Sequence, residues 1–331
     1  MRFRWRHRLL LVFVVWLFCT LGFGWWSLFS PLTPPAESSV SIESGSSLLS
    51  IANTLADHQI IRSALTFRLL ARIQGRATAL QAGTYSFTRA AAASVVLDRL
   101  TAGDVDQVSI TIPEGFNLQQ IARRLAEAGV ADQTKIIAAA QDAAFLDKLG
   151  VKAKSLEGYL FPETYHFVPG ISRFELLRMM VNETELQLLR LQKLDKHKTH
   201  FNRHQLLTLA SIIQKETGQE EEMPLISAVF YNRLARNMPL QTDPTVIYGI
   251  PDFNGNLTRK DLQTQSPYNT YLNRGLPPGP IASPGFKALQ AAAEPAQSDY
   301  LYFVARGDGT HQFSSTLAEH NRAVRKFQLH H

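Results

Sequence analysis

Residues 205–218 read Gln-Leu-Leu-Thr-Leu-Ala-Ser-Ile-Ile-Gln-Lys-Glu-Thr-Gly, an apolar helical pattern that ends in one carboxylate, Glu216. Leu209 and Ile213 recur on one face of the predicted helix, and Glu216 lies at the edge of that face because it follows Ile212 by one helical turn. Gly218 is a typical stop signal after a helix. The segment therefore predicts a buried helix that carries a carboxyl group at its C-terminal end.

That position suits Glu216 to acid catalysis. A carboxyl group held against leucine and isoleucine is partly desolvated, which raises its pKa, and the negative end of a helix dipole acts in the same direction. A raised pKa lets a glutamate donate a proton near neutral pH, as general acids that cleave sugars do. The alternative is a structural glutamate that pairs with a nearby Lys or Arg. Residues Glu220–Glu222 precede Pro224, and we interpret them as the solvated start of the next helix.

The N-terminus predicts a membrane anchor. Four arginines, at positions 2, 4, 6 and 8, precede an apolar run, Leu9–Trp26, which would span about 27 Å as a helix. No basic residue follows before Arg62, so the positive-inside rule places the N-terminus in the cytosol and the C-terminal domain in the periplasm, as a single-pass protein of the cell inner membrane. A cleaved signal peptide is the alternative, but the run is long for one and no small-residue cleavage site follows it.

Composition narrows the classes of partner. The net charge is +6 and four of these charges belong to the N-terminal arginines, so the exported part is only mildly basic and nucleic acid is not expected as a partner. Cys19 is the only cysteine, which excludes an intrachain disulfide. We expect no cofactor and no metal. His197, His200 and His204 have metal-like spacing, but Lys196, Lys198 and Arg203 beside them would repel a cation.

The chain divides by composition into four parts. We expect a basic terminus and transmembrane anchor over residues 1–29, a Pro/Ser-rich linker over 30–39, a small subdomain over 40–105 and a catalytic domain over 106–331. Ser41–Ala56 and Thr111–Ala126 form a weak repeat, in which Ile, Gly, Leu, Ile-Ala and Leu-Ala recur at equal spacing. The first copy continues through a helix near Ser63–Ile73 to a strand, Leu80–Phe87. This strand–helix–helix–strand unit resembles LysM, a small glycan-binding fold.

The second half predicts further elements. A long helix is expected over Arg173–Leu194, a β-hairpin around the Gly-rich turn between Tyr300–Ala305 and His311–Ser315, and a last helix over about Leu317–Phe327. Glu157–Tyr165 is dense in aromatic residues, which can stack on sugar rings but more often belong to a core. The predicted fold class is therefore α+β, with one N-terminal transmembrane helix, the LysM-like subdomain and a mixed catalytic domain.

Several further motifs carry a family resemblance over about residues 40–327. They are Ala210–Thr217, Val229–Leu234, Leu240–Gly249, Ser266–Tyr271, Gly275–Ile281 and Tyr300–Val304. Together they resemble the YceG-like family of endolytic murein transglycosylases, whose catalytic glutamate falls on Glu216. Many members carry a second glutamate where this chain has Gln214, which leaves Glu216 as the only carboxylate of that turn.

The resemblance implies a lytic transglycosylase that cuts the MurNAc–GlcNAc β-1,4 bond of nascent peptidoglycan, forms 1,6-anhydroMurNAc ends and terminates strand growth beside the glycan polymerases. Asp243 is either a second carboxylate, as in a hydrolytic muramidase, or a helix N-cap before Pro244. A non-catalytic peptidoglycan-binding scaffold is the third alternative. Candidate sugar-binding residues are Asn232, Gln241, Thr242, Asp243, Tyr248, Tyr268, Asn269 and Tyr271.

Overall fold

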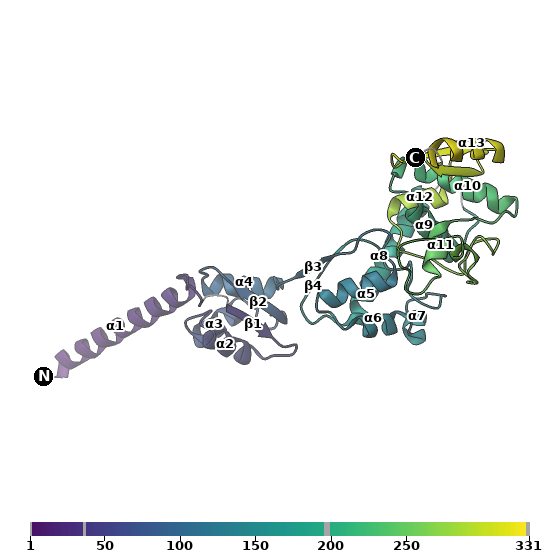
Figure 1. Cartoon of the computed structure of the whole chain (residues 1–331). Coiled ribbons are helices and arrows are strands. Elements are labelled where there is room, and N and C mark those ends of the chain that lie inside the picture. The colour runs from purple at the N-terminus through teal and green to yellow at the C-terminus, as the bar shows by residue number, and fades with distance from the viewer. Residues whose placement is uncertain (1, 36–37, 195–198, 329–331) are drawn as a thin grey trace. The chain divides into compact units, whose positions relative to one another are not determined.

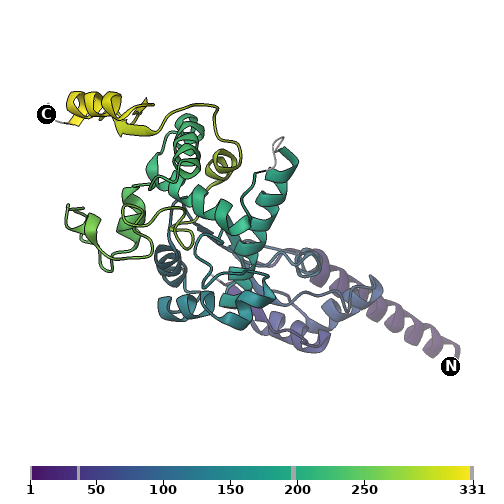
Figure 2. The same ribbon diagram turned by 90° about the vertical axis from the view of Figure 1, so that its right-hand side faces the viewer.

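The computed structural model describes residues 2–35, 38–194 and 199–328, with side chains from residue 10 onward, and it divides into two compact units. The first comprises residues 1–108 and 166–170, and the second comprises residues 109–165 and 171–331. Helices dominate both units, and the strands form small two-stranded sheets (Figures 1 and 2). The α+β class predicted from the sequence is confirmed.

The first unit is built on an antiparallel strand pair. β1 (Ser38–Ile42) pairs with β2 (Gly83–Phe87), so that Val40 lies opposite Tyr85. Two helices connect the strands and a third follows them; these are α2 (Leu48–Asp57), α3 (Ala64–Ile73) and α4 (Ala93–Ala102). Apolar side chains from all five elements form one buried core. The strand–helix–helix–strand order expected here is therefore observed, and α4 is added to it.

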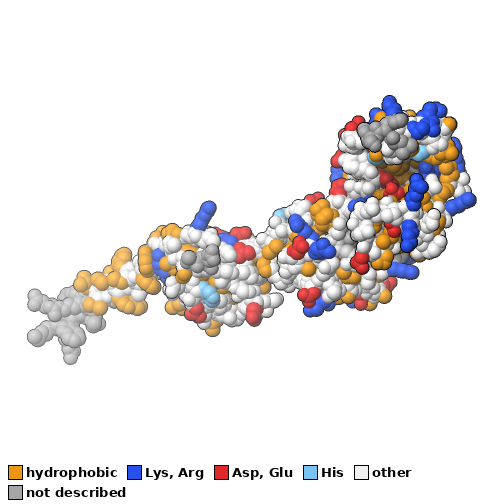
Figure 3. All heavy atoms as spheres, viewed as in Figure 1, with side chains coloured by type: hydrophobic (Ala, Val, Ile, Leu, Met, Phe, Trp, Pro, Cys, Tyr) orange, Lys and Arg blue, Asp and Glu red, His pale blue; other side chains and the backbone are white. Residues whose placement is uncertain are grey.

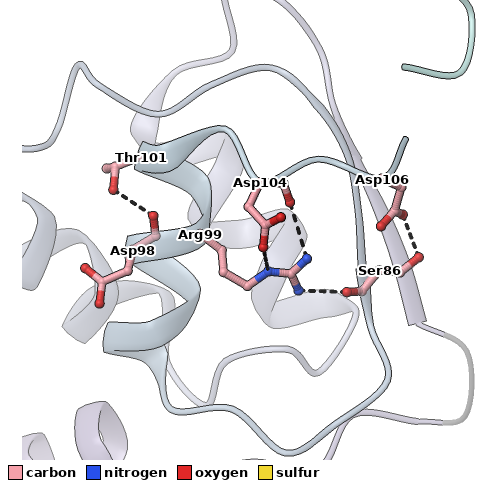
Figure 4. Close-up of polar contacts among 6 residues, drawn as sticks. All are labelled: Ser86, Asp98, Arg99, Thr101, Asp104 and Asp106. Carbon is pink, nitrogen blue, oxygen red and sulfur yellow. Dashed lines mark hydrogen bonds and ion pairs between the residues drawn. The ribbon is translucent and has the colours of Figure 1, made fainter. Parts of the chain in front are cut away.

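Polar contacts fix the chain that leaves α4 (Figure 4). The Arg99 guanidinium contacts the Asp104 carboxylate through Nε at 2.8 Å and donates from Nη1 to the Ser86 carbonyl oxygen at 2.8 Å. The Ser86 hydroxyl in turn donates to Asp106 Oδ2 at 2.6 Å. These contacts hold residues 104–106 against β2, so the segment that follows α4 is fixed relative to the strand pair of the first unit.

The N-terminal helix α1 (Arg2–Phe29) belongs to the first unit and packs against α3 and α4 at its C-terminal end. Its segment Leu10–Phe29 is long and apolar enough to cross a membrane. Ser27 is buried, and its hydroxyl lies 2.9 Å from that of Thr66 on α3. The Arg62 guanidinium lies over the Trp26 ring, 4.3 Å from its centroid. The last turn of α1 is therefore part of the fold of this unit.

The segment expected to be a free linker, residues 30–39, is held along part of its length. Arg62 donates to the carbonyl oxygen of Ser30 at 2.5 Å and to that of Pro31 at 2.9 Å. Leu32 forms an isolated antiparallel bridge with Ala91, and β1 already begins at Ser38. These backbone contacts leave less free chain than composition alone indicates.

The second unit begins with a strand pair and a helical layer. Its elements are β3 (Val108–Thr111), α5 (Leu118–Glu127), α6 (Gln133–Ala140), α7 (Ala143–Lys148), β4 (Thr164–Phe167) and α8 (Arg173–Leu194). β3 pairs with β4, and α6 packs against α5, α7 and α8. Asn117 and Gln120 form a capping box at the start of α5. The bounds of α8 are those predicted from the sequence.

The rest of the second unit surrounds α9. The remaining elements are α9 (Arg203–Glu216), the 3₁₀ turn η1 (Glu220–Glu222), α10 (Met223–Ala235), α11 (Asp243–Tyr248), the 3₁₀ turn η2 (Asp261–Gln263), α12 (Phe286–Ala293), β5 (Tyr302–Ala305), β6 (His311–Ser314) and α13 (Leu317–Gln328). α9 packs against α10, α11 and α12, while α13 packs on the β5–β6 hairpin. The hairpin and the last helix are confirmed near their predicted bounds.

Candidate active site

Glu216 is the last residue of α9, and the sequence fixes this helix at both ends. Asn202 caps its start, because Asn202 Oδ1 accepts from the Gln205 backbone NH while Gln205 Oε1 accepts from that of Asn202, each at 3.0 Å. Every residue from Leu206 to Ile213 is buried. The Ser211 hydroxyl also accepts from the backbone NH of Ile281 at 3.0 Å. A rigid helix therefore presents Glu216 at its tip.

The surroundings of Glu216 favour its protonated form. The pKa of Glu216 is raised to about 7, mainly by burial and in part by the negative charge of Asp243. The Thr242 hydroxyl and the Arg233 guanidinium act in the opposite direction. The side chain itself is only partly buried, and its carboxyl group reaches a cavity. The desolvated acid predicted from the sequence pattern thus has the protonation behaviour that proton donation near neutral pH requires.

The loop before α11 brings a second carboxylate beside Glu216. Gln241 has a positive φ of 51°, and the backbone NH groups of Gln241 and Thr242 donate to the carbonyl oxygen and the hydroxyl of Thr270 at 3.1 Å each. Thr242 is the N-cap of α11, so the capping role predicted for Asp243 is wrong. Asp243 instead accepts a 2.6 Å hydrogen bond from the Tyr271 hydroxyl. Asp243 also lines the cavity that Glu216 borders.

Arg233 is a site residue that the sequence reasoning did not select. It is 8% exposed; its Nε donates to the Leu301 carbonyl oxygen at 2.7 Å and its Nη1 donates to that of Leu240 at 2.8 Å. It thereby ties the residue just before β5 to the loop that carries Thr242. Its charge also acts on Glu216. Arg233 lies within the quoted motif Val229–Leu234. A charged residue on the predicted buried face of α10 was the pattern that could have indicated its role.

The carboxyl of Glu216 opens into a cavity of about 440 Å³. Its walls include Glu216, Arg233, Gln241, Asp243, Tyr271, Phe303, His311 and His320. The His320 ring stacks on that of Tyr302 with centroids 5.1 Å apart, and burial lowers the pKa of His320. The cavity therefore combines a carboxyl group of raised pKa, polar side chains and aromatic rings, a combination suited to a sugar ligand.

The C-terminal hairpin is held at this cavity by Glu222. Its carboxylate accepts from the His311 backbone NH at 2.9 Å and contacts His311 Nδ1 at 2.7 Å. Glu220 and Glu221 are exposed, as expected for a solvated helix start, but Glu222 is not. The difference arises because β6, distant in sequence, packs its backbone against η1.

Four of the predicted sugar-binding residues lie outside the Glu216 cavity. Asn232 donates from Nδ2 to the carbonyl oxygens of Ser298 and Tyr300, each at 2.9 Å. The buried Asn269 amide donates to the carbonyl oxygens of residues 262 and 264 at 3.0 and 2.8 Å. Tyr248 and Tyr268 pack together with ring centroids 4.8 Å apart. Gln241, Thr242, Asp243 and Tyr271, by contrast, lie at or beside Glu216.

A second buried glutamate, Glu157, shares the raised pKa. Burial raises its pKa to about 7, while hydrogen bonds partly offset the effect. Both carboxylate oxygens lie 3.1 Å from the Leu118 backbone NH, and Oε2 also accepts from the Tyr248 hydroxyl at 3.1 Å. Glu157 therefore links the start of α5 to the end of α11.

Of the three histidines considered as metal ligands, His204 has two hydrogen-bond partners within the protein. His204 contacts the Tyr159 hydroxyl at 2.7 Å through Nδ1 and the Pro278 carbonyl oxygen at 2.8 Å through Nε2. His197 lies outside the described residues. Within residues 2–35, 38–194 and 199–328, no group of three or more His, Cys, Asp or Glu side chains is placed to hold a metal ion. His204 therefore has a structural role, linking α9 to two loops.

Comparison with known proteins finds relatives over most of the chain. The YceG-like family matches residues 40–326. An endolytic murein transglycosylase of Bacillus subtilis (strain 168) is 36% identical over 91% of this chain and 88% of its own length. One of Streptococcus pneumoniae serotype 2 is 32% identical over 95% of this chain, which spans 63% of that protein.

A solved structure gives the same assignment. The crystal structure of a putative YceG-like protein from Listeria monocytogenes superposes with a TM-score of 0.59 and 35% identity, over 86% of this chain and 98% of that one. The family match covers most of the chain and includes the β3–β4 pair, the Glu216 helix and the C-terminal hairpin. On these grounds the chain belongs to the YceG-like family.

Proposed function

We propose that this chain is a membrane-anchored endolytic lytic transglycosylase that cleaves the MurNAc–GlcNAc β-1,4 bond of peptidoglycan. The observation that carries the proposal is the position of Glu216, whose pKa is raised to about 7 at the wall of an open polar cavity. A relative of similar length bears the name endolytic murein transglycosylase. A glutamate that is protonated near neutral pH and reachable by a glycan is the acid that such a reaction needs.

Glu216 serves both halves of the reaction. Its proton passes to the glycosidic oxygen as the bond from that oxygen to MurNAc C1 breaks, which releases GlcNAc with a free 4-hydroxyl. The resulting carboxylate then takes the proton of the MurNAc 6-hydroxyl as that oxygen bonds to C1. Glu216 ends protonated, no water is consumed, and the product is a 1,6-anhydroMurNAc end.

The single-acid scheme fits the neighbours of Glu216. A hydrolytic muramidase needs a second carboxylate as base or nucleophile, and Asp243 is the nearest candidate. Its Oδ1 already accepts from Tyr271, and its charge raises the pKa of Glu216. In our proposal Asp243 therefore keeps Glu216 protonated and binds sugar hydroxyls, together with Gln241, Thr242 and Tyr271.

We further propose that α1 anchors the enzyme in the inner membrane, with its N-terminus in the cytosol and both units in the periplasm. The helix is long enough, and the four arginines precede it. Residues 40–105 would then be a LysM-like glycan-binding subdomain and residues 106–331 the catalytic domain. Because the chain between α1 and β1 is partly held, the enzyme would meet nascent strands beside their polymerases rather than mature wall.

Product analysis tests the chemistry. The detergent-solubilised full chain is incubated with peptidoglycan, and the fragments are weighed. We expect internal fragments with anhydro ends. Reducing ends would instead indicate a hydrolase that uses Asp243, and intact glycan would indicate a binding scaffold, so either result would overturn the proposal.

Two cellular measurements test the setting. Protease added to spheroplasts should digest both units, and protection of the Glu216 region would contradict the proposed topology. Cells that lack the protein, or that carry Glu216→Gln, should have longer glycan strands. Unchanged strand length in cells without a redundant enzyme would refute the role in chain termination.

A further inference from the structure

Helix α3 presents an apolar stripe on its outer face. Leu65, Leu69 and Ile73 are 62%, 49% and 83% exposed, and their spacing of four residues places them in one row. The opposite face, with Phe67 and Leu70, is buried in the core of the first unit. The stripe is therefore additional to the face that the fold needs.

The stripe lies between the anchor helix and two arginines. Successive residues of a helix are about 100° apart around its axis. In this angular order Thr66 follows Ile73 at one edge of the stripe. At the other edge, Arg72 follows Leu65 and Arg68 comes next. The Thr66 hydroxyl is the group that contacts Ser27 of α1. One edge of the stripe thus adjoins the end of α1, and the other edge is basic.

The two arginines are available for an external partner. Arg72 is exposed, and Arg68 is partly exposed with a buried Nε that has no hydrogen-bond partner in the described residues. Neither forms an ion pair with any side chain that the structure describes, whereas Arg76 just beyond the helix pairs with Asp98. Their charge is therefore not neutralised within the first unit.

We propose that α3 lies in the membrane interface, with its stripe among the acyl chains and with Arg68 and Arg72 on the phosphates of anionic phospholipids. The inference rests on the proposed membrane anchoring. If Leu10–Phe29 crosses the bilayer, the bilayer surface lies where α1 meets α3. At this place Ser27 is buried in the first unit, and the Arg62 guanidinium lies over the Trp26 ring. On the face that Figure 3 shows, hydrophobic side chains are prominent along the described part of α1.

The chemistry of the surface matches this occupant. Interfacial helices bury an apolar face about 5–10 Å into the boundary between headgroups and acyl chains, with basic residues at the polar edge. Anionic lipids attract such residues electrostatically. The apolar stripe of α3 adjoins the end of α1, so it would contact lipid at the point where α1 leaves the bilayer. No protein partner is then needed to bury the stripe. The first unit would consequently be held in one orientation on the membrane.

Site-directed spin labelling tests the contact. The full chain is reconstituted in vesicles of phosphatidylglycerol and phosphatidylethanolamine, and collision with oxygen and with a water-soluble nickel chelate is measured. In a Cys19→Ser background, which removes the only cysteine, a label is placed by Leu69→Cys; Ser44→Cys, in the exposed polar turn after β1, is the matched control. We expect the label at 69 to favour oxygen and the label at 44 to favour nickel.

The outcomes separate this inference from the anchoring on which it rests. A label on native Cys19 that favours oxygen, with one at 69 that favours nickel, would overturn the role of α3 and leave the anchor intact. Labels at both positions that favour nickel would overturn the anchor as well. A label at 69 shielded from both reagents, with dipolar broadening, would indicate a second copy of the chain and would also refute lipid contact.

Charge variants test the lipid chemistry. Arg68→Gln combined with Arg72→Gln should shift the label at 69 toward the nickel chelate and remove the difference between anionic and purely zwitterionic vesicles. Arg123→Gln, an exposed arginine of the second unit, is the control and should change neither reading. An unchanged depth at 69 in the double variant would exclude the proposed role of the arginines.

Discussion

Glu216 and Glu157 have the same raised pKa, about 7, and the same main cause, burial, yet their surroundings differ. Glu157 is 6% exposed at the wall of a different cavity, and its oxygens accept hydrogen bonds from the Leu118 backbone and from Tyr248. Glu216 lies at a helix tip that borders an open cavity. A perturbed pKa alone therefore does not identify a catalytic acid. The two differ in their partners, because hydrogen bonds tie Glu157 to α5 and α11, whereas Glu216 borders the cavity that Arg233 and Asp243 also line.

The sharpest test exchanges each glutamate for glutamine. Glu216→Gln keeps the shape but cannot transfer a proton, so cleavage should fall by about 10²- to 10⁴-fold while glycan binding persists. Glu157→Gln is the matched control, because it changes the same residue type at a buried carboxyl that hydrogen bonds hold between α5 and α11. Release of anhydro fragments measures both variants, and equal losses would abolish the distinction between the two sites.

The pH dependence of cleavage should follow Glu216. Its acid form is lost as the pH rises through about 7, so the rate of cleavage should decline above that pH. Asp243 raises the pKa of Glu216, and Asp243→Asn should therefore move this alkaline limb to lower pH. Rates measured from pH 5 to pH 9 on both proteins would show the shift. An alkaline limb that moves to higher pH in Asp243→Asn would contradict the electrostatic role of Asp243.

Glu157 should govern stability rather than turnover. Its folded pKa of about 7 exceeds the ordinary value of 4.5, so its contribution to the free energy of unfolding is complete below pH 4.5 and is lost as the pH rises toward 7. The loss is on the order of a few kcal/mol at most. Denaturant titrations should show that Glu157→Gln flattens this decline, and a curve parallel to that of the parent protein would exclude the effect.

The smallest effect is expected at Tyr271. Tyr271→Phe removes the hydroxyl that donates to Asp243, which is exposed enough to be solvated instead. The free energy of unfolding should fall by about 0.5–1.5 kcal/mol, the usual net value of one hydrogen bond. Thermal denaturation measures this, while a loss of activity comparable to that of Glu216→Gln would place Tyr271 in the chemistry itself.

The sequence was sufficient where the signal is local. Helical periodicity and a stop signal placed Glu216 at the end of α9, and the bounds of α8 were predicted without error. It failed where the deciding contact is distant in the chain. Glu222 binds β6, and Asn232 holds the backbone before β5, across separations that no local pattern encodes. The role of Arg233 could not be predicted, because it depends on the backbone carbonyl groups that the folded chain places around its guanidinium.

The Glu216 cavity has a further consequence for the order of folding. Its walls combine α9 and α10 with β5 and α13, so its parts are separated by about a hundred residues of chain. Contacts of such long range form slowly, because loop closure must precede them. The α9 helix can therefore form while Glu216 is still hydrated and has an ordinary carboxylate pKa. In our proposal the cavity at Glu216 is complete only once the C-terminal hairpin has docked, so cleavage of glycan would be one of the last properties that the folding chain acquires.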